Sequence, residues 1–201
     1  KCIPVAAGMA GGSTDAAAVL YGMNKLWRLG IPMQRLMEYG LQIGADVPFC
    51  LLRGTALAEG IGEELTSLPP MPGCYVLIAK PPVSVSTKLV YQTLDALKQP
   101  QHPPIDAQIQ DLEAQDLQSL AAHMGNVLED VTIPMHPQIT QIKQLMIAQG
   151  ALSAMMSGSG PTVFGIFLDK TKAYKAKEQI RDSGLAKQVY VTKPYNKEIN
   201  R

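Results

Sequence analysis

The beginning of the chain combines glycine, alanine and hydroxyl side chains in a way that could bind an anion. The run leads into an alanine-rich helical pattern, and it consists of Pro4, Val5, Ala6, Ala7, Gly8, Met9, Ala10, Gly11, Gly12, Ser13 and Thr14. Small residues let backbone N–H groups approach a ligand closely. A helix start behind them adds unpaired donors and the positive end of the helix dipole. We therefore predict a phosphate site here.

The spacing of this run limits the kind of phosphate site. No Gly-Lys-Ser/Thr follows the glycines, so the run is not a Walker loop, and it lacks the G-x-G-x-x-G of dinucleotide sites. The hydroxyls of Ser13 and Thr14 could cap the helix or bind a phosphate or its magnesium. Asp15 is expected to stabilise the first helical turn. On composition alone, an ordinary glycine loop before a capped helix remains an alternative.

A second candidate for chemistry is a single carboxylate in an apolar stretch. Asp46 follows Ala45 and precedes Val47-Pro48-Phe49. A carboxylate in apolar surroundings is unfavourable unless it has a partner, so its presence calls for an explanation. The alternative is an aspartate that caps a helix or lies in a surface loop.

Two further groups lie later in the chain. Thr87 and Tyr91 are one turn apart in a predicted helix and share a face, where the aromatic ring could stack on a pyrimidine. Tyr91 could equally be a core residue. Gly158, Ser159 and Gly160 form a second glycine loop, which could also be a plain turn before a strand.

Composition and charge exclude several classes of protein. The net charge of the 201 residues is +1, and no basic run interleaved with aromatic residues indicates nucleic-acid binding. Hydrophobic residues make up 46% of the chain, enough for a core, yet no apolar run is long enough to span a bilayer. Cys2, Cys50 and Cys74 are scattered, which argues against a disulfide framework or zinc site and suits the reducing cytoplasm.

The hydrophobic periodicity predicts an α+β chain whose second half alternates strands with helices. Helices are expected at residues 13–28, 32–44, 86–97, 108–125, 136–149 and 170–182. Strands are expected at residues 50–59, 74–79, 153–156, 162–168 and 188–192, with Cys50 and Cys74 buried in strands and inert. Residues 68–73, rich in proline, are the best domain boundary, and a split β-α-β arrangement is expected after it. The three histidines, His102, His123 and His136, are expected to be solvated.

Three segments in order, residues 4–16, 41–49 and 157–161, resemble the motifs of the GHMP kinases, a superfamily of small-metabolite kinases. Four segments, residues 7–17, 44–48, 59–63 and 85–91, allow a narrower comparison. Their sequences are most similar to those of the members that phosphorylate a cytidine diphosphate-linked methylerythritol in non-mevalonate isoprenoid precursor biosynthesis. The resemblance implies the later part of an N-terminal ATP-binding domain at residues 1–67 and a ferredoxin-like C-terminal domain at residues 68–201. Because the family's first motif precedes the phosphate loop, it also implies an N-terminally truncated chain.

The resemblance assigns a role to each candidate. Residues 4–14 would bind ATP, with Ser13 and Thr14 as candidate Mg²⁺ ligands, and Asp46 would be the catalytic base that also contacts the substrate. Thr87 and Tyr91 would hold the cytidine side of the substrate, and residues 158–160 would support the phosphate loop. We expect a cytoplasmic kinase that is a monomer or weak homodimer, without nucleic-acid or membrane partners. The alternatives are a homoserine- or mevalonate-type kinase, or a nucleotide-binding fragment without catalysis.

Overall fold

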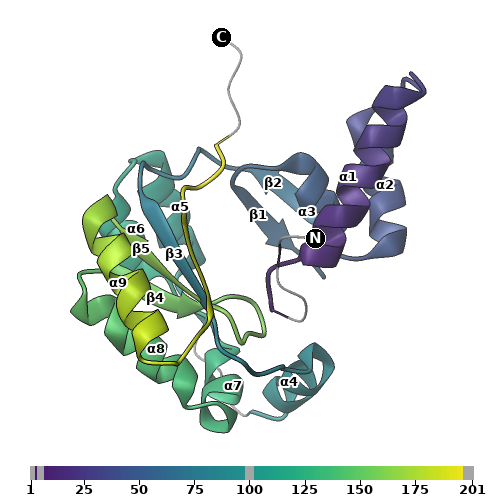
Figure 1. Cartoon of the computed structure of the whole chain (residues 1–201). Helices are drawn as coiled ribbons and strands as arrows, with labels where there is room; N and C mark the ends of the chain where they lie inside the picture. The colour runs from purple at the N-terminus through teal and green to yellow at the C-terminus, as the bar shows by residue number, and fades with distance from the viewer. Residues whose placement is uncertain (1–2, 4–6, 98–101, 197–201) are drawn as a thin grey trace. The chain divides into compact units, whose positions relative to one another are not determined.

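The computed structural model describes residue 3, residues 7–97 and residues 102–196, and it divides into two compact units. The larger unit contains Pro72–Pro194 with the described residues up to Met9, and the smaller contains Ala10–Met71 with Tyr195 and Asn196. Both combine helices with a sheet, as Figure 1 shows, so the α+β class expected from the sequence is confirmed. The predicted domains at residues 1–67 and 68–201 were defined from the sequence. The two compact units do not test that boundary, so it stays a prediction.

The larger unit is built on a four-stranded antiparallel sheet. Its strands are β3 (Tyr75–Lys80), β4 (Ser153–Met156), β5 (Val163–Phe167) and β6 (Gln188–Thr192), in the order β4-β5-β3-β6. Central strand β3 pairs on both sides, with Leu77 opposite Gly165 of β5 and Val191 of β6. This order, with helices between β3 and β4 and between β5 and β6, is the expected ferredoxin-like arrangement.

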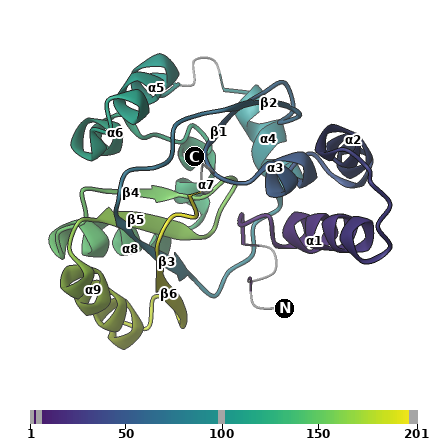
Figure 2. The ribbon, with the colours of Figure 1, turned by 90° about the horizontal axis from the view of Figure 1, so that it is seen from above.

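Two helices lie side by side on this sheet, α8 (Gln138–Ala148) and α9 (Lys170–Asp182), as Figures 1 and 2 show. The buried residues of both helices recur at helical spacing and pack with the strands in one core. They are Ile139, Ile142 and Met146 of α8 and Ala173, Ala176 and Ile180 of α9. Helix α9 begins at Asp169, whose carboxylate accepts hydrogen bonds from the N–H groups of Thr171 and Lys172. The sequence predicted α9, β4 and β6 at their observed bounds.

The remaining helices of the larger unit differ from the prediction. They are α4 (Thr87–Asp95), α5 (Ile105–Glu113), α6 (Leu117–His123) and α7 (Glu129–Met135). A single helix over residues 108–125 is wrong, because Gln115 adopts a φ of 55° and Asp116 then caps a new helix. Helix α7 was not predicted; it has seven residues and contains Pro134, which weakens the helical signal.

The smaller unit contains α1 (Gly11–Leu26), α2 (Met33–Ile43), α3 (Val47–Leu52) and a hairpin of β1 (Ala56–Glu59) and β2 (Glu64–Ser67). Ala17, Leu36, Val47 and Leu51 form its core. The strand predicted at residues 50–59 is wrong at residues 50–52, which belong to α3, and the observed strand begins only at Ala56. Pro48 suits a first helical turn, and Val47, Pro48 and Leu51 are buried at helical spacing; a short apolar run does not distinguish the two structures.

The helices are short relative to a lipid bilayer. A membrane-spanning helix needs about 20 apolar residues, and α1 has 16. Within residues 7–97 and 102–196, the helices all fall short of the length and apolar character needed to cross a membrane.

Candidate functional site

The predicted phosphate loop turns into α1 two residues earlier than expected. Ala10 adopts a left-handed φ of 46° and precedes the helix, which begins at Gly11. Thr14 is the first residue whose N–H reaches a carbonyl four residues back, that of Ala10 at 2.8 Å. The N–H groups of Gly11, Gly12 and Ser13 therefore have no acceptor within the helix, which is the arrangement that binds anions. Pro4, Val5 and Ala6 lie outside the described residues.

The hydroxyls of Ser13 and Thr14 do not cap this helix. The capping position is occupied by Ala10, and no side chain accepts a bond there. Thr14 instead donates its hydroxyl proton back to the Ala10 carbonyl at 2.9 Å. Because α1 starts early, both hydroxyls fall inside its first turn. The capping alternative is wrong, and binding of phosphate or metal stays a prediction.

Gly8 packs tightly against the second glycine loop, within the larger unit. Its φ is 67°, and a Cβ there would lie 2.2 Å from the backbone oxygen of Ser157. The Ser157 hydroxyl donates to the Gly8 carbonyl at 2.7 Å. Only glycine suits this combination of conformation and close approach. The structure thus places Gly8 beside the loop at residues 157–160, although a supporting role in ligand binding stays a prediction.

The same loop contacts the segment predicted to hold the substrate. Ser159 is buried, and its Oγ lies 2.8 Å from Oγ1 of Thr87, the first residue of α4. Tyr91, one turn further, is 51% exposed, whereas its neighbour Val90 is fully buried. Val90 therefore anchors α4 to the core, and the alternative of Tyr91 as a core residue is wrong.

Asp46 lies at the start of α3 in the smaller unit. Its neighbours Val47 and Pro48 are buried, but Asp46 is exposed, so the expectation of apolar surroundings is wrong. The turn into α3 directs the apolar residues inward and leaves the carboxylate toward solvent. Nor does the side chain cap α3. Among the hydrogen bonds and ion pairs of the described chain, none involves this carboxylate, which leaves it available to a ligand.

Cys50 connects α3 with the first turn of α1. Its Sγ lies 3.6 Å from Thr14 Oγ1, within hydrogen-bond distance. Burial is the main cause that raises the pKa of the Cys50 thiol; the contact with Thr14 lowers it, and the charge of Asp46 raises it. Thr14 and Asp46 thus both influence the pKa of the Cys50 thiol. Burial likewise raises the pKa of Cys74, so both thiols stay protonated at neutral pH.

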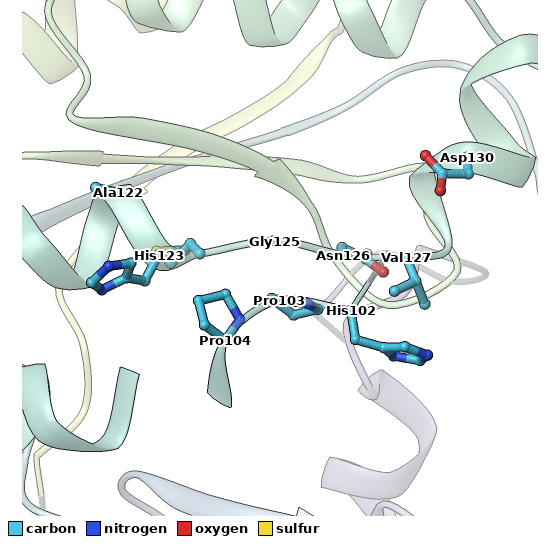
Figure 3. A pocket seen from close by; sticks show the side chains of 10 residues that line it. His102, Pro103, Pro104, Ala122, His123, Gly125, Asn126, Val127 and Asp130 are labelled. Carbon is cyan, nitrogen blue, oxygen red and sulfur yellow. The ribbon is translucent and has the colours of Figure 1, made fainter. Parts of the chain in front are cut away.

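The larger unit contains a hollow of about 600 Å³. Figure 3 shows Asn126 and Val127 at one end of it and Ala122 and His123 at the other. His102 is exposed, as expected. The ring of His123 is partly exposed, and its Nδ1 lies 2.7 Å from the Asp111 carboxylate, so this histidine is solvated only in part. In the part of the chain that the structure describes, no three His, Cys, Asp or Glu side chains are grouped to hold a metal.

Sequence reasoning missed three residues that hold the loop at residues 157–160, namely Asn126, Glu129 and Thr132. Asn126 comes just before α7 and accepts a hydrogen bond from the N–H of Leu128 through its own side chain. That local pattern is a signal for a helix start, and it would have indicated α7 but not the distant loop.

Comparison with known proteins gives consistent matches along the chain. Residues 1–54 match the GHMP kinases N terminal domain, and residues 108–186 match the GHMP kinases C terminal family. The chain is 59% identical to the 4-diphosphocytidyl-2-C-methyl-D-erythritol kinase of Lachnospira eligens, over 97% of this chain and 68% of that protein. It is 53% identical to the enzyme of the same name from Lachnoclostridium phytofermentans, over 96% of this chain and 66% of the relative.

Solved structures agree with these matches. A crystal structure of 4-(cytidine 5'-diphospho)-2C-methyl-D-erythritol kinase superposes with a TM-score of 0.81 at 30% identity, covering 96% of this chain and 68% of that one. A homoserine kinase from Cytophaga hutchinsonii gives the same TM-score at 21% identity, covering 98% of this chain and 68% of its own, which shows a shared fold. The chain spans about two thirds of the length of these relatives.

Proposed function

This chain belongs to the GHMP kinases, within the family of 4-diphosphocytidyl-2-C-methyl-D-erythritol kinases, and we propose that it transfers a phosphoryl group from ATP to the C2 hydroxyl of 4-diphosphocytidyl-2-C-methyl-D-erythritol. The C2 oxygen forms a bond to the γ-phosphorus of ATP, the bond to the β,γ-bridging oxygen breaks, and the hydroxyl proton leaves. The products are the 2-phosphate and ADP, in the supply of isoprenoid precursors by the non-mevalonate route.

The observation that carries this proposal is the uncapped start of α1 directly after Gly8. The N–H groups of Gly11, Gly12 and Ser13 lack acceptors within the helix, and the helix dipole adds positive charge at the same end. Phosphoryl transfer depends mainly on positioning and on stabilising charge on the phosphate oxygens. Fixed backbone donors supply both the positioning and the charge stabilisation without a cluster of lysine side chains. This suits a chain of net charge +1.

Asp46 is proposed as the group that accepts or orients the C2 hydroxyl proton. Its carboxylate is exposed and not used to cap α3, so it is available to a substrate hydroxyl. General base catalysis requires a hydrogen bond of this kind in the bound complex. Thr87 and the half-exposed ring of Tyr91 are proposed to hold the cytidine side of the substrate, since they share one face of α4.

Magnesium is part of the proposal, with Ser13 favoured over Thr14 as its protein ligand. Mg²⁺ prefers oxygen ligands, usually one or two from the protein plus substrate phosphates. The Thr14 hydroxyl already donates to Ala10 and contacts the thiol of Cys50. The Ser13 hydroxyl is half-buried, and no hydrogen bond of the described residues uses it. When bound, Mg²⁺ neutralises charge that develops on the transferred phosphate.

We also propose that the reaction takes place in the cytoplasm and that the protein acts as a monomer or weak homodimer. The protonated thiols of Cys50 and Cys74, both free, suit a reducing compartment. Light scattering across a concentration series tests the assembly state.

The test is release of ADP from ATP with and without 4-diphosphocytidyl-2-C-methyl-D-erythritol, on this chain and on a form extended upstream. Substrate-dependent release supports the proposal, and release only from the extended form assigns an essential part to the added segment. ADP release with homoserine or mevalonate instead would contradict the proposed substrate assignment. ATP binding without turnover in either form would contradict the kinase activity and favour a nucleotide-binding role.

A further inference from the structure

The loop at residues 157–160 is held from behind by one asparagine. Nδ2 of Asn126 donates to two backbone carbonyls, those of Met156 and Gly158, each at 2.8 Å. Its Oδ1 accepts from the N–H of Leu128 at 3.0 Å, which fixes the orientation of the amide. The side chain therefore uses both amide hydrogens and its carbonyl oxygen at once, and it connects the start of α7 to both sides of Ser157.

Two other residues near the start of α7 complete this support. Oε1 of Glu129 accepts from the Met156 N–H at 2.7 Å, and its other oxygen pairs with Lys143. Thr132, fully buried, donates its hydroxyl to the Ser159 carbonyl at 3.2 Å. We call Asn126, Glu129 and Thr132 the clamp. The clamp thus bonds the backbone at Met156, Gly158 and Ser159, and the loop cannot shift without breaking these hydrogen bonds.

With its backbone fixed, the loop presents two hydroxyls to two different segments. Ser157 donates to the carbonyl of Gly8, in the predicted phosphate loop. Ser159 bonds to the hydroxyl of Thr87, in the predicted substrate segment. Both contacts lie within the larger unit. The position of one short loop therefore determines the position of a nucleotide-side carbonyl and of a substrate-side hydroxyl.

We propose that Asn126 is a positioning residue for phosphoryl transfer, which acts through Ser157 on the ATP side and through Ser159 on the substrate side. The identity of the two ligands rests on the proposed function above. Asn126 touches neither ligand; it fixes the loop so that Gly8 and Thr87 keep a constant separation. Reacting groups must be held in a narrow geometry for efficient transfer, so a small loop displacement lowers the rate.

The decisive variant is Asn126→Asp, which keeps the shape and the acceptor for Leu128 but places a carboxylate oxygen against the Met156 and Gly158 carbonyls. Ser157→Ala and Ser159→Ala each remove one of the two outward bonds. Gln108→Glu is the matched control, because Gln108 is also a partly buried amide that donates to one backbone carbonyl, that of His123, away from the loop.

The measurements are KM for ATP, KM for 4-diphosphocytidyl-2-C-methyl-D-erythritol and kcat, in whichever form turns over. Ser157→Ala should raise the KM for ATP roughly three- to tenfold, the factor for one ordinary hydrogen bond, with little change in the other KM. Ser159→Ala should do the reverse. Asn126→Asp should raise both and lower kcat, while Gln108→Glu should match the wild type.

Amide hydrogen exchange without ligands tests the clamp separately from the reaction. Asn126→Asp should speed exchange in peptides covering residues 156–160 at least tenfold, and Gln108→Glu should not. Unchanged exchange in Asn126→Asp, or the two serine variants altering the same KM, would overturn the proposal. If the wild type lacks substrate-dependent ADP release, the substrate assignment fails; dissociation constants for ATP then replace KM, and unchanged affinity in both Asn126→Asp and Ser157→Ala overturns the inference.

Discussion

Helix α9 begins with a side chain that satisfies its first amide groups, whereas helix α1 begins without one. Asp169 accepts from Thr171 and Lys172, and Asp116 does the same for Gln118 and Ser119 at the start of α6. Ala10 offers no side-chain acceptor to α1. Capping by the protein's own side chain stabilises a helix but occupies its donors. Helices α6 and α9 are capped in this way, whereas α1, the helix proposed to bind phosphate, keeps its first donors free.

A second contrast concerns three aspartates in the same position of their helices. Asp46, Asp116 and Asp169 each precede the first helical residue, yet only the last two cap. Asp116 and Asp169 have extended backbones, with ψ of 92° and 122°, whereas Asp46 is already helical, with ψ of −9°. A capping residue needs an extended backbone to turn its carboxylate toward the N–H groups. The conformation of Asp46 therefore leaves its carboxylate to other partners.

The largest expected effect follows from replacing Asp46. Asp46→Asn keeps the shape of the side chain but removes the proton acceptor, so kcat should fall roughly 10²- to 10⁴-fold, the range for loss of general base catalysis. ATP affinity, measured by calorimetry, should stay the same. Asp169→Asn is the control, since asparagine caps as well as aspartate, and its kcat should equal the wild type. Full activity of Asp46→Asn would remove Asp46 from the mechanism.

Giving α1 a carboxylate should weaken nucleotide binding. Ala10→Asp is compatible with the left-handed backbone, but it places a negative charge beside the donors proposed for phosphate. Repulsion of about 1 kcal/mol even in water predicts ATP affinity at least about fivefold lower. Ala10→Asn tolerates the same backbone without the charge and should bind ATP more tightly than Ala10→Asp. Equal affinities for the two variants would contradict phosphate binding at this helix start.

Removing a framework cap should affect stability alone. Asp169→Ala leaves the N–H groups of Thr171 and Lys172 without their acceptor, and we expect a loss of about 1 kcal/mol. For a chain of this size, that corresponds to a fall in Tm of roughly 2–4 °C. Calorimetric unfolding measures the shift, and ATP affinity should not change. A large loss of ATP affinity in this variant would show that α9 contributes to nucleotide binding as well as to stability.

The smallest effect is a dependence on pH at α6. Hydrogen bonds from the hydroxyl and N–H of Ser119 hold the pKa of Asp116 below its ordinary value. A folded pKa below the unfolded one means that the stabilisation is present above the unfolded pKa and is lost as pH falls through the folded pKa. The Tm difference between the wild type and Asp116→Ala should therefore be present at pH 7 and shrink below about pH 4. A difference that stays constant over this range would contradict the capping role.

Local signals predicted elements with a regular apolar pattern better than short elements without one. Helix α9 and strands β4 and β6 were predicted at their bounds, because Asp169 precedes the periodic apolar residues of α9 and a glycine, Gly150 or Gly184, lies shortly before each strand. Helix α3 was taken for part of a strand, and β2 was not predicted, since its four residues are stabilised only by pairing with β1. Short elements depend on partners that the local sequence does not reveal.

The candidate site divides in the same way. The phosphate loop and the loop at residues 157–160 were found from their glycines and hydroxyls, which are sequence features. The contact between them joins Ser157 to Gly8, 149 residues apart, and no local pattern indicates it. The clamp was not predicted for the same reason, because Asn126 donates to the carbonyls of Met156 and Gly158, 30 and 32 residues away. The exposure of Asp46 likewise depends on how α3 packs.

The loop at residues 157–160 also lies within a hairpin, because β4 and β5 are adjacent strands and Met156 pairs with Val163. Its length is therefore fixed at both ends by strand register. Successive residues of a strand face opposite sides, so one residue inserted into β4 would turn the strand residues beyond the insertion to the opposite face of the sheet. Strand β4 should therefore tolerate insertions poorly, whereas the turn at Gln115 between α5 and α6 has no strand register to disrupt.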